Sequence, residues 1–236
     1  MTNFPPPWPW SCFARGMNAT RMTPLNPTLN NLPDPDLRRV ASAVAGIQGA
    51  RRAAILSLLR DPKELPGMLD QPAIARAARQ LKGRVSDPLY CYVEVRQRLL
   101  SAGIRNRETA LYLSGTWCEY RETGLLPETT EKAVDLLETV DILRELNFVE
   151  GYEKFELLVR CGNYYLFLMA FFEGWFRELE RLKGRPALAY YEAFARIAYR
   201  AARDHGLCEE FGLRSVFNDL SSRFTEVRGA LASLAG

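Results

Sequence analysis

A run of nine apolar and aromatic residues, Tyr164–Phe172 (YYLFLMAFF), constrains the fold of this chain more than any other segment. Such a run must be removed from water, but a membrane-spanning helix needs about 20 mainly apolar residues, and here Glu173 follows at once. Further apolar residues, including Trp175 and Phe176, recur at the spacing of three to four residues that is typical of a helix. We therefore predict a buried central helix from Asn163 to Lys183.

Proline and glycine residues delimit the other predicted helices. Asp34-Pro35 and Ser86-Asp87-Pro88 have the composition of helix starts, and glycines follow several of the periodic segments. The predicted helices are residues 34–59, which Gly46 and Gly49 could interrupt, and residues 88–100, 105–121, 127–147, 151–160, 163–183, 186–204 and 213–234. Because no alternating strand pattern is bounded by hairpin turns, we predict an all-α bundle of about eight helices with short connections.

The first 35 residues contain eight prolines, a composition that disfavours both helices and strand pairing. We predict that residues 1–35 form a disordered tail and that residues 36–236 form one α-helical domain, which could divide into subdomains 36–124 and 125–236. The tail does not resemble a secretory signal, because no basic stretch precedes an apolar one. The five cysteines are an odd number, lie at least 27 residues apart and form no C-x-x-C pair, which is typical of reduced, buried thiols. Both observations favour a cytoplasmic protein.

The charge is unevenly distributed along the chain. Residues 36–108 contain 14 lysines and arginines against 7 acidic residues, whereas residues 109–236 contain 15 against 20. We expect the two parts to face each other within one fold or across a dimer. A nucleic-acid-binding surface built on Arg38, Arg39, Arg51 and Arg52 is the alternative, but nucleic-acid-binding surfaces usually have denser basic clusters, so we do not expect nucleic acid as the partner.

Few classes of catalytic site can be built from this sequence. The single histidine, His205, excludes di-iron bundles and H-E-x-x-H zinc sites, and we expect it to cap a helix C-terminus as an imidazolium. The nucleotide-binding and nucleophile motifs G-x-x-x-x-G-K-[ST], G-x-G-x-x-G and G-x-S-x-G are absent from the sequence. We therefore expect no catalytic residue, metal or cofactor, although the sequence leaves the question of enzymatic activity open.

A ligand pocket is the most specific site that the sequence suggests. Glu173 interrupts the most apolar helix, and Tyr164, Tyr165, Trp175 and Tyr191 could line an aromatic pocket around it. The simpler interpretation is that Glu173 pairs with an arginine and that the aromatic residues belong to the core.

Two predicted helices have distinctive faces. Acidic residues recur every three or four positions between Glu128 and Glu145, which is typical of a solvated helix face and less often of a cation site. Seven apolar residues from Leu213 to Leu234 are spaced as a heptad seam, which could close the bundle or join two copies of the chain. The segment Gly103–Tyr120 resembles a helix-turn-helix only weakly, because its glycine is one position late.

The segment Gly162–Phe172 (GNYYLFLMAFF) and the later pair Tyr190-Tyr191 resemble an uncharacterised bacterial all-α family with a Gly-Asp/Asn-Tyr, Leu-Phe, Phe-Phe pattern. The similarity covers residues 155–234, and Ala170 and Glu173 depart from the pattern. It implies a compact helical module and no particular activity.

The sequence therefore predicts a non-catalytic interaction or regulatory protein, with a protein partner or a second copy of itself. A small-molecule or lipid-binding protein, or an enzyme with a pocket near Glu173, is the first alternative. A nucleic-acid-binding regulator that uses the basic part is the second.

Overall fold

The computed structural model describes Leu29 and residues 32–46, 49–123, 146–183 and 187–234. Within these ranges the regular structure consists of twelve α-helices and no strand, which confirms the all-α prediction. The helices are α2 (Asp34–Ala45), α3 (Gly49–Arg60), α4 (Leu65–Asp70), α5 (Pro72–Gln80), α6 (Asp87–Ser101), α7 (Arg107–Thr123), α10 (Gly151–Phe171), α11 (Glu173–Lys183), α12 (Leu188–Asp204), α13 (Gly206–Glu210), α14 (Arg214–Ser222) and α15 (Phe224–Ala232). The prediction of about eight helices is too low, because the short helices α4, α5 and α13 were not predicted and the expected helices 34–59, 163–183 and 213–234 are each divided.

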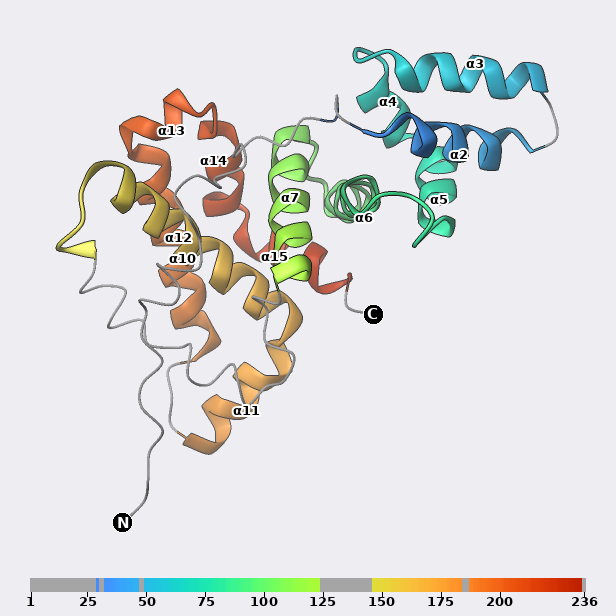
Figure 1. Ribbon diagram of the computed structural model, residues 1–236. Coiled ribbons are helices and arrows are strands. Elements are labelled where there is room, and N and C mark those ends of the chain that lie inside the picture. Colours follow the sequence, from blue (N-terminus) through green and yellow to red (C-terminus); the bar gives the residue numbers. More distant parts are fainter. Residues whose placement is uncertain (1–28, 30–31, 47–48, 124–145, 184–186, 235–236) are drawn as a thin grey trace.

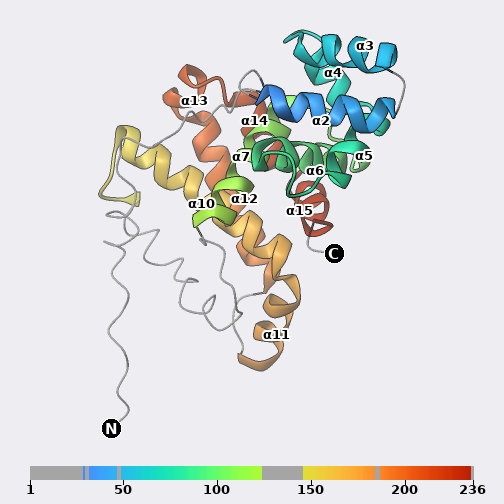
Figure 2. The same ribbon diagram turned by 45° about the vertical axis from the view of Figure 1, so that its right-hand side comes forward.

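Helices α6 and α7 form the middle of the molecule. Helices α2 to α5 lie on one side of this pair and helices α10 to α14 on the other, as the two ribbon views agree (Figures 1 and 2). Helix α6 contacts α5, α7 and α15, whereas α10 packs most extensively on α12. Among the described residues, none of the helices combines the length and apolar character that a membrane span requires.

The central helix differs from the prediction at both of its ends. Helix α10 runs without a break from Gly151 to Phe171, so the expected joint at Gly162 is wrong. The break lies instead at Phe172, whose backbone leaves the helical region (φ −128°, ψ 31°), and α11 begins directly after it. Glycine at position 162 serves a close approach to another helix, because a Cβ atom there would lie 2.7 Å from the ring of Tyr199.

The core is built around the second half of α10. The residues from Tyr165 to Met169 have no exposed surface, and Phe176 on α11 is 1% exposed. At the ends of the apolar run, Tyr164, Phe171 and Phe172 are only half-buried. Aromatic contacts extend this core, since the ring of Phe167 meets Tyr120 edge-on at 5.2 Å between centroids.

The predicted C-terminal helix is two helices, α14 and α15, with a break at Arg223 (φ −116°, ψ 32°). The Arg223 guanidinium donates hydrogen bonds to the carbonyls of Ala102 and Gly103 at the end of α6, each at 3.1 Å. The break lets α14 pack on α12 and α7 while α15 packs on α10 and α6. Six of the seven seam residues are at most 2% exposed within this single chain, namely Leu213, Phe217, Leu220, Phe224, Val227 and Leu231. The seam therefore closes the bundle.

The first described helix begins two residues before the predicted start of the helical domain. Helix α2 starts at Asp34, and Leu29 and Leu32 pack against the core, so the ordered helices begin slightly before residue 36. Residues 1–28 and the acidic face between Glu128 and Glu145 lie outside the described residues.

Candidate functional site

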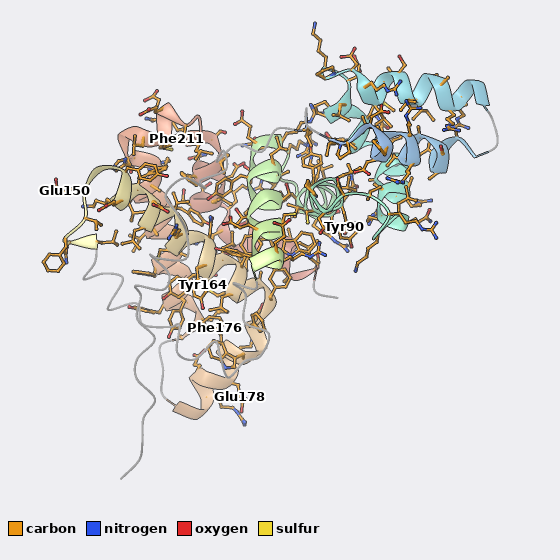
Figure 3. All side chains as sticks on the ribbon, in the orientation of Figure 1. Tyr90, Glu150, Tyr164, Phe176, Glu178 and Phe211 are labelled. Atoms are coloured by element: carbon orange, nitrogen blue, oxygen red, sulfur yellow. The ribbon has the colours of Figure 1, made fainter. Side chains whose placement is uncertain are left out.

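The aromatic residues predicted to line a pocket lie close together and contact one another or Phe176 through their rings. Tyr165 stacks on Tyr191 at 5.8 Å and meets Tyr164 edge-on at 5.6 Å, and Trp175 meets Phe176 at 5.0 Å. Figure 3 shows Tyr164 and Phe176 near the junction of α10 and α11. Tyr165 and Tyr191 are buried, and burial raises the pKa of the phenols of Tyr164 and Tyr165. A ligand pocket among these residues stays a prediction.

Glu173 is held in a network of ion pairs at the start of α11. Its carboxylate lies 2.5 Å from Arg177 on the same helix and 3.3 Å from Arg228 on α15. Arg228 also approaches Glu192 on α12 at 4.0 Å, and Arg196 pairs with Glu192 at 2.8 Å. These contacts tie α11, α12 and α15 together, which agrees with the structural interpretation of Glu173.

A second polar group is fully enclosed by the core. The hydroxyls of Tyr112 and Tyr199 each donate a hydrogen bond to Oδ1 of Asn163 at 2.9 Å, and Asn163 Nδ2 donates to Tyr112 at 2.8 Å. Burial raises the pKa of both phenols, so they remain protonated donors. Because these polar atoms satisfy one another away from water, they specify the packing of α7, α10 and α12.

His205 lies between α12 and α13. Its Nδ1 accepts a hydrogen bond from the backbone N–H of Leu207 at 3.3 Å, and its ring lies 5.4 Å from that of Phe155. The side chain therefore caps the N-terminus of α13 and not the C-terminus of α12, which corrects the helix end that we expected it to cap.

An ion-pair cluster surrounds Asp70 in a shallow hollow at the junction of α4, α6 and α7. Arg96, whose side chain is 3% exposed, donates to both carboxylate oxygens of Asp70 at 2.7 and 3.0 Å. Arg96 also donates to the carbonyl of Arg105 at 2.9 Å, and Arg107 donates to Asp70 at 2.9 and 3.0 Å. Burial disfavours the charged carboxylate, but hydrogen bonds from Arg96 and Arg107 outweigh it and lower the pKa of Asp70. The cluster joins the end of α4 and the start of α7 to Arg96 within α6.

A second hollow is lined by arginines from three separate segments, and we call it the arginine hollow. Its lining residues are Arg38, Arg39, Ser42 and Ala43 on α2, Arg52 on α3, and Leu81 and Arg84 in the turn after α5. Its wall therefore combines four guanidinium groups with the small apolar surface of an alanine and a leucine. Three of these arginines are among the residues of the basic surface that the sequence suggested.

Two carboxylates set the spacing of the helices around the arginine hollow. Asp36 is 3% exposed and accepts hydrogen bonds from the backbone N–H of Ser86 at 2.8 Å and from Arg39 at 3.2 Å. These bonds fix α2 against the segment that carries Arg84. Asp34 accepts from Arg38 at 2.5 Å and from Arg60 at 2.7 Å, which ties the start of α2 to the end of α3.

The arginine hollow retains positive charge that the described residues do not neutralise. Arg38 and Arg39 pair with Asp34 and Asp36, but neither Arg52 nor Arg84 has an ion-pair partner among the described residues. Hydrogen bonds from Arg38, then from Arg60, lower the pKa of Asp34, so its carboxylate is charged at neutral pH.

Arg84 is the residue that the sequence analysis missed. It follows Gly83, which has a left-handed backbone (φ 75°), in the turn directly before the helix start at Ser86. A basic residue in a turn next to a helix start is too common a pattern to indicate a site, and only the fold brings it to α2 and α3.

Comparisons with models of protein families, with curated proteins and with solved structures find no match to this chain. Within the described ranges, no group of three or more histidine, cysteine, aspartate or glutamate side chains is placed to hold a metal ion.

Proposed function

We propose that this protein is a non-catalytic interaction module that binds an acidic segment of a partner protein in the arginine hollow. The observation that supports the proposal is the convergence of four guanidinium groups from α2, α3 and the turn after α5, of which Arg52 and Arg84 are unpaired among the described residues. Guanidinium groups bind carboxylates through charge-assisted and often bidentate hydrogen bonds.

The mixed character of the lining favours a protein partner over nucleic acid. Asp34 and Asp36 stand beside Arg38 and Arg39, so the local charge is positive but interrupted. A phosphate backbone repeats its charge at short intervals and binds best to a continuous basic stripe. An acidic peptide also has aliphatic groups, which Ala43 and Leu81 in the hollow can contact.

The test uses fluorescence anisotropy with a short labelled polyglutamate peptide, a polyglutamine peptide of equal length and a random DNA duplex. The matched variants are Arg52→Gln/Arg84→Gln, which breaks no ion pair of the described structure, and Arg200→Gln, which removes an exposed arginine on α12. We expect polyglutamate to bind, polyglutamine not to bind, and the double variant alone to weaken binding by about tenfold or more.

Three results would contradict the proposal. The first is equal binding of polyglutamate to the double variant and to the unmodified chain. The second is the absence of any polyglutamate binding at low salt. The third is tighter binding of the DNA duplex than of polyglutamate at about 0.15 M salt, which would identify nucleic acid as the ligand.

A further inference from the structure

Helices α6 and α7 bring two cysteines together that lie 27 residues apart in the sequence. Cys91 on α6 has no exposed surface, and Cys118 on α7 is 8% exposed. Both are free thiols, and each is the largest influence on the pKa of the other. Cys118 lies one helical turn before Arg121, which contacts the Cys91 sulfur. Cys118 also lies at the rim of the core, where its sulfur is 3.9 Å from Glu122.

A fixed positive charge stands beside this pair. Arg121 on α7 donates through Nη1 to the Cys91 sulfur at 3.5 Å. Its guanidinium lies over the rings of Trp117 at 5.4 Å and Tyr90 at 5.9 Å, and Figure 3 marks Tyr90 on α6. These two ring contacts hold the guanidinium in place, so the charge next to the sulfur is preorganised.

The surroundings of the two cysteines shift their pKa values in opposite directions. The neighbouring Cys118 thiol and, against burial, the contact with Arg121 lower the pKa of Cys91. The neighbouring Cys91 sulfur, followed by burial, raises the pKa of Cys118. A thiolate is the nucleophilic form of cysteine, so Cys91 is the attacking sulfur and Cys118 the neighbouring thiol.

The other two described cysteines provide an internal contrast. Burial alone raises the pKa of Cys161 to about 12, and burial is also the largest influence on Cys208, whose pKa it raises. Within the described part of the chain, no arginine donates a hydrogen bond to either sulfur, although the charges of Arg214 and Arg203 partly offset the effect of burial on Cys208. Oxidants of protein thiols should therefore react much faster with the Cys91–Cys118 pair than with Cys161 or Cys208.

We propose that Cys91 and Cys118 form a thiol-redox modification site, at which hydrogen peroxide converts the two thiols into a reversible disulfide between α6 and α7. Peroxide is close to water in size, and Cys118 is the side of the pair nearer to solvent, because it is 8% exposed whereas Cys91 has no exposed surface. Arg121 positions the reactive sulfur and stabilises its negative charge.

The reaction has two steps. The Cys91 thiolate attacks one peroxide oxygen, the O–O bond breaks, and the departing hydroxide takes up a proton to become water, leaving a sulfenic acid on Cys91. The Cys118 sulfur then attacks the Cys91 sulfur, the S–S bond forms, and the S–O bond breaks with loss of water that carries the Cys118 proton. Two thiols are oxidised while one peroxide is reduced to two waters.

The experiment uses the full chain with Cys12→Ser, because Cys12 lies outside the described residues. The protein is treated with hydrogen peroxide, unfolded in an alkylating reagent, digested and analysed by mass spectrometry. We expect a peptide pair joined through Cys91 and Cys118 that dithiothreitol separates, while Cys161 and Cys208 remain alkylated. Cys161→Ser is the matched control and should leave the rate of disulfide formation unchanged.

Two further variants separate the proposed roles. In Cys118→Ser the sulfenic acid on Cys91 should persist and react with dimedone, because the second thiol is missing. Arg121→Met keeps an apolar chain over Trp117 and should slow oxidation about three- to tenfold by raising the pKa of Cys91. Circular dichroism shows whether each variant is folded. If a variant does not fold, the disulfide map of the Cys12→Ser chain still tests the proposal.

The proposal is wrong if peroxide leaves both Cys91 and Cys118 alkylated, or if Cys161 or Cys208 is oxidised first. Accumulation of a sulfenic acid on Cys91 while Cys118 is still a free thiol would also contradict it. An unchanged oxidation rate in a folded Arg121→Met variant would remove the role of the guanidinium.

Discussion

A Cβ atom on Gly162 would lie 2.7 Å from Cε1 of Tyr199, closer than real Cβ atoms approach another atom. Tyr199 has no room to move away, because it is completely buried and its hydroxyl donates to Asn163 at 2.9 Å. This contact explains why a glycine stands in the middle of a long helix: it lets α10 and α12 approach each other closely.

Gly162→Ala should therefore destabilise the protein, although alanine is the better helix former. Overpacking of a rigid core costs about 1–3 kcal/mol, which exceeds the gain of about 1 kcal/mol in helix propensity. Gly229→Ala is the matched control, because Gly229 lies in α15 with open space around its Cα. Urea denaturation should show that the control is unchanged or more stable and that Gly162→Ala is less stable, whereas equal stabilisation by both would contradict the close approach.

The buried hydroxyls allow a second matched pair of variants. Tyr199→Phe removes a hydrogen bond to Asn163 and should cost about 1–2 kcal/mol in the free energy of unfolding. Tyr165→Phe removes a buried hydroxyl that has no hydrogen-bond partner among the described residues, and it should be neutral or stabilising. Thermal and urea unfolding of the two variants measure this difference, and a larger cost for Tyr165→Phe would show that its hydroxyl has a partner.

The fold class followed from the sequence because periodicity and helix-start signals are local. The ends of the central helix did not, since glycine has two opposite uses: it terminates a helix, and it admits a neighbouring side chain. Gly103, which does follow the end of α6, has the left-handed backbone of a terminator (φ 77°), whereas Gly162 is helical and touches Tyr199. Sequence alone does not distinguish these uses, because the ring that decides the second one lies 37 positions further along the chain.

The candidate site was less predictable than the fold. The sequence indicated a basic N-terminal part, but the arginine hollow depends on Asp36 accepting from the backbone of Ser86, a contact across 50 residues. That contact brings Arg84 to α2. Glu173 was singled out for interrupting an apolar run, and the structure surrounds it with Arg177 and Arg228.

The core assignment of α10 predicts the effect of Phe167→Ala. Phe167 has no exposed surface, and its ring contacts Tyr120 and Phe171. Removing it should lower the free energy of unfolding by about 3–5 kcal/mol. Phe148→Ala is the control, since that side chain is 86% exposed and its loss should change stability by less than about 0.5 kcal/mol. A small effect of Phe167→Ala in guanidinium denaturation would place that face of α10 in solvent.

The ion pairs of Asp70 predict a pH dependence of stability. The folded state lowers the pKa of this carboxyl, so it binds fewer protons than the unfolded state does. Its contribution is present above the unfolded pKa of about 4 and is lost as the pH falls through the lower, folded value.

Asp70→Asn should cost about 3 kcal/mol at pH 7, because Arg96 keeps its charge in a nearly buried position. The difference from the unmodified chain should begin to shrink below about pH 4 and should be lost as the pH falls through the lower pKa of folded Asp70, where the folded chain also takes up the proton. Glu210→Gln removes an exposed acidic residue and is the control. Urea titrations across this pH range provide the measurement, and a difference that does not depend on pH would contradict the linkage.

Phe224 tests whether the C-terminal seam belongs to the core of one chain. It has no exposed surface, and its ring lies 6.4 Å from that of Tyr199 and 5.8 Å from the guanidinium of Arg196. Phe224→Asp would bury a carboxylate at a cost of several kcal/mol, a large part of the about 5–15 kcal/mol that stabilises a typical domain. We expect the variant to unfold, as circular dichroism would detect, whereas Asn218→Asp on the exposed face of α14 should stay folded. A folded Phe224→Asp chain with half the mass of the unmodified protein by light scattering would instead place the seam in a dimer interface.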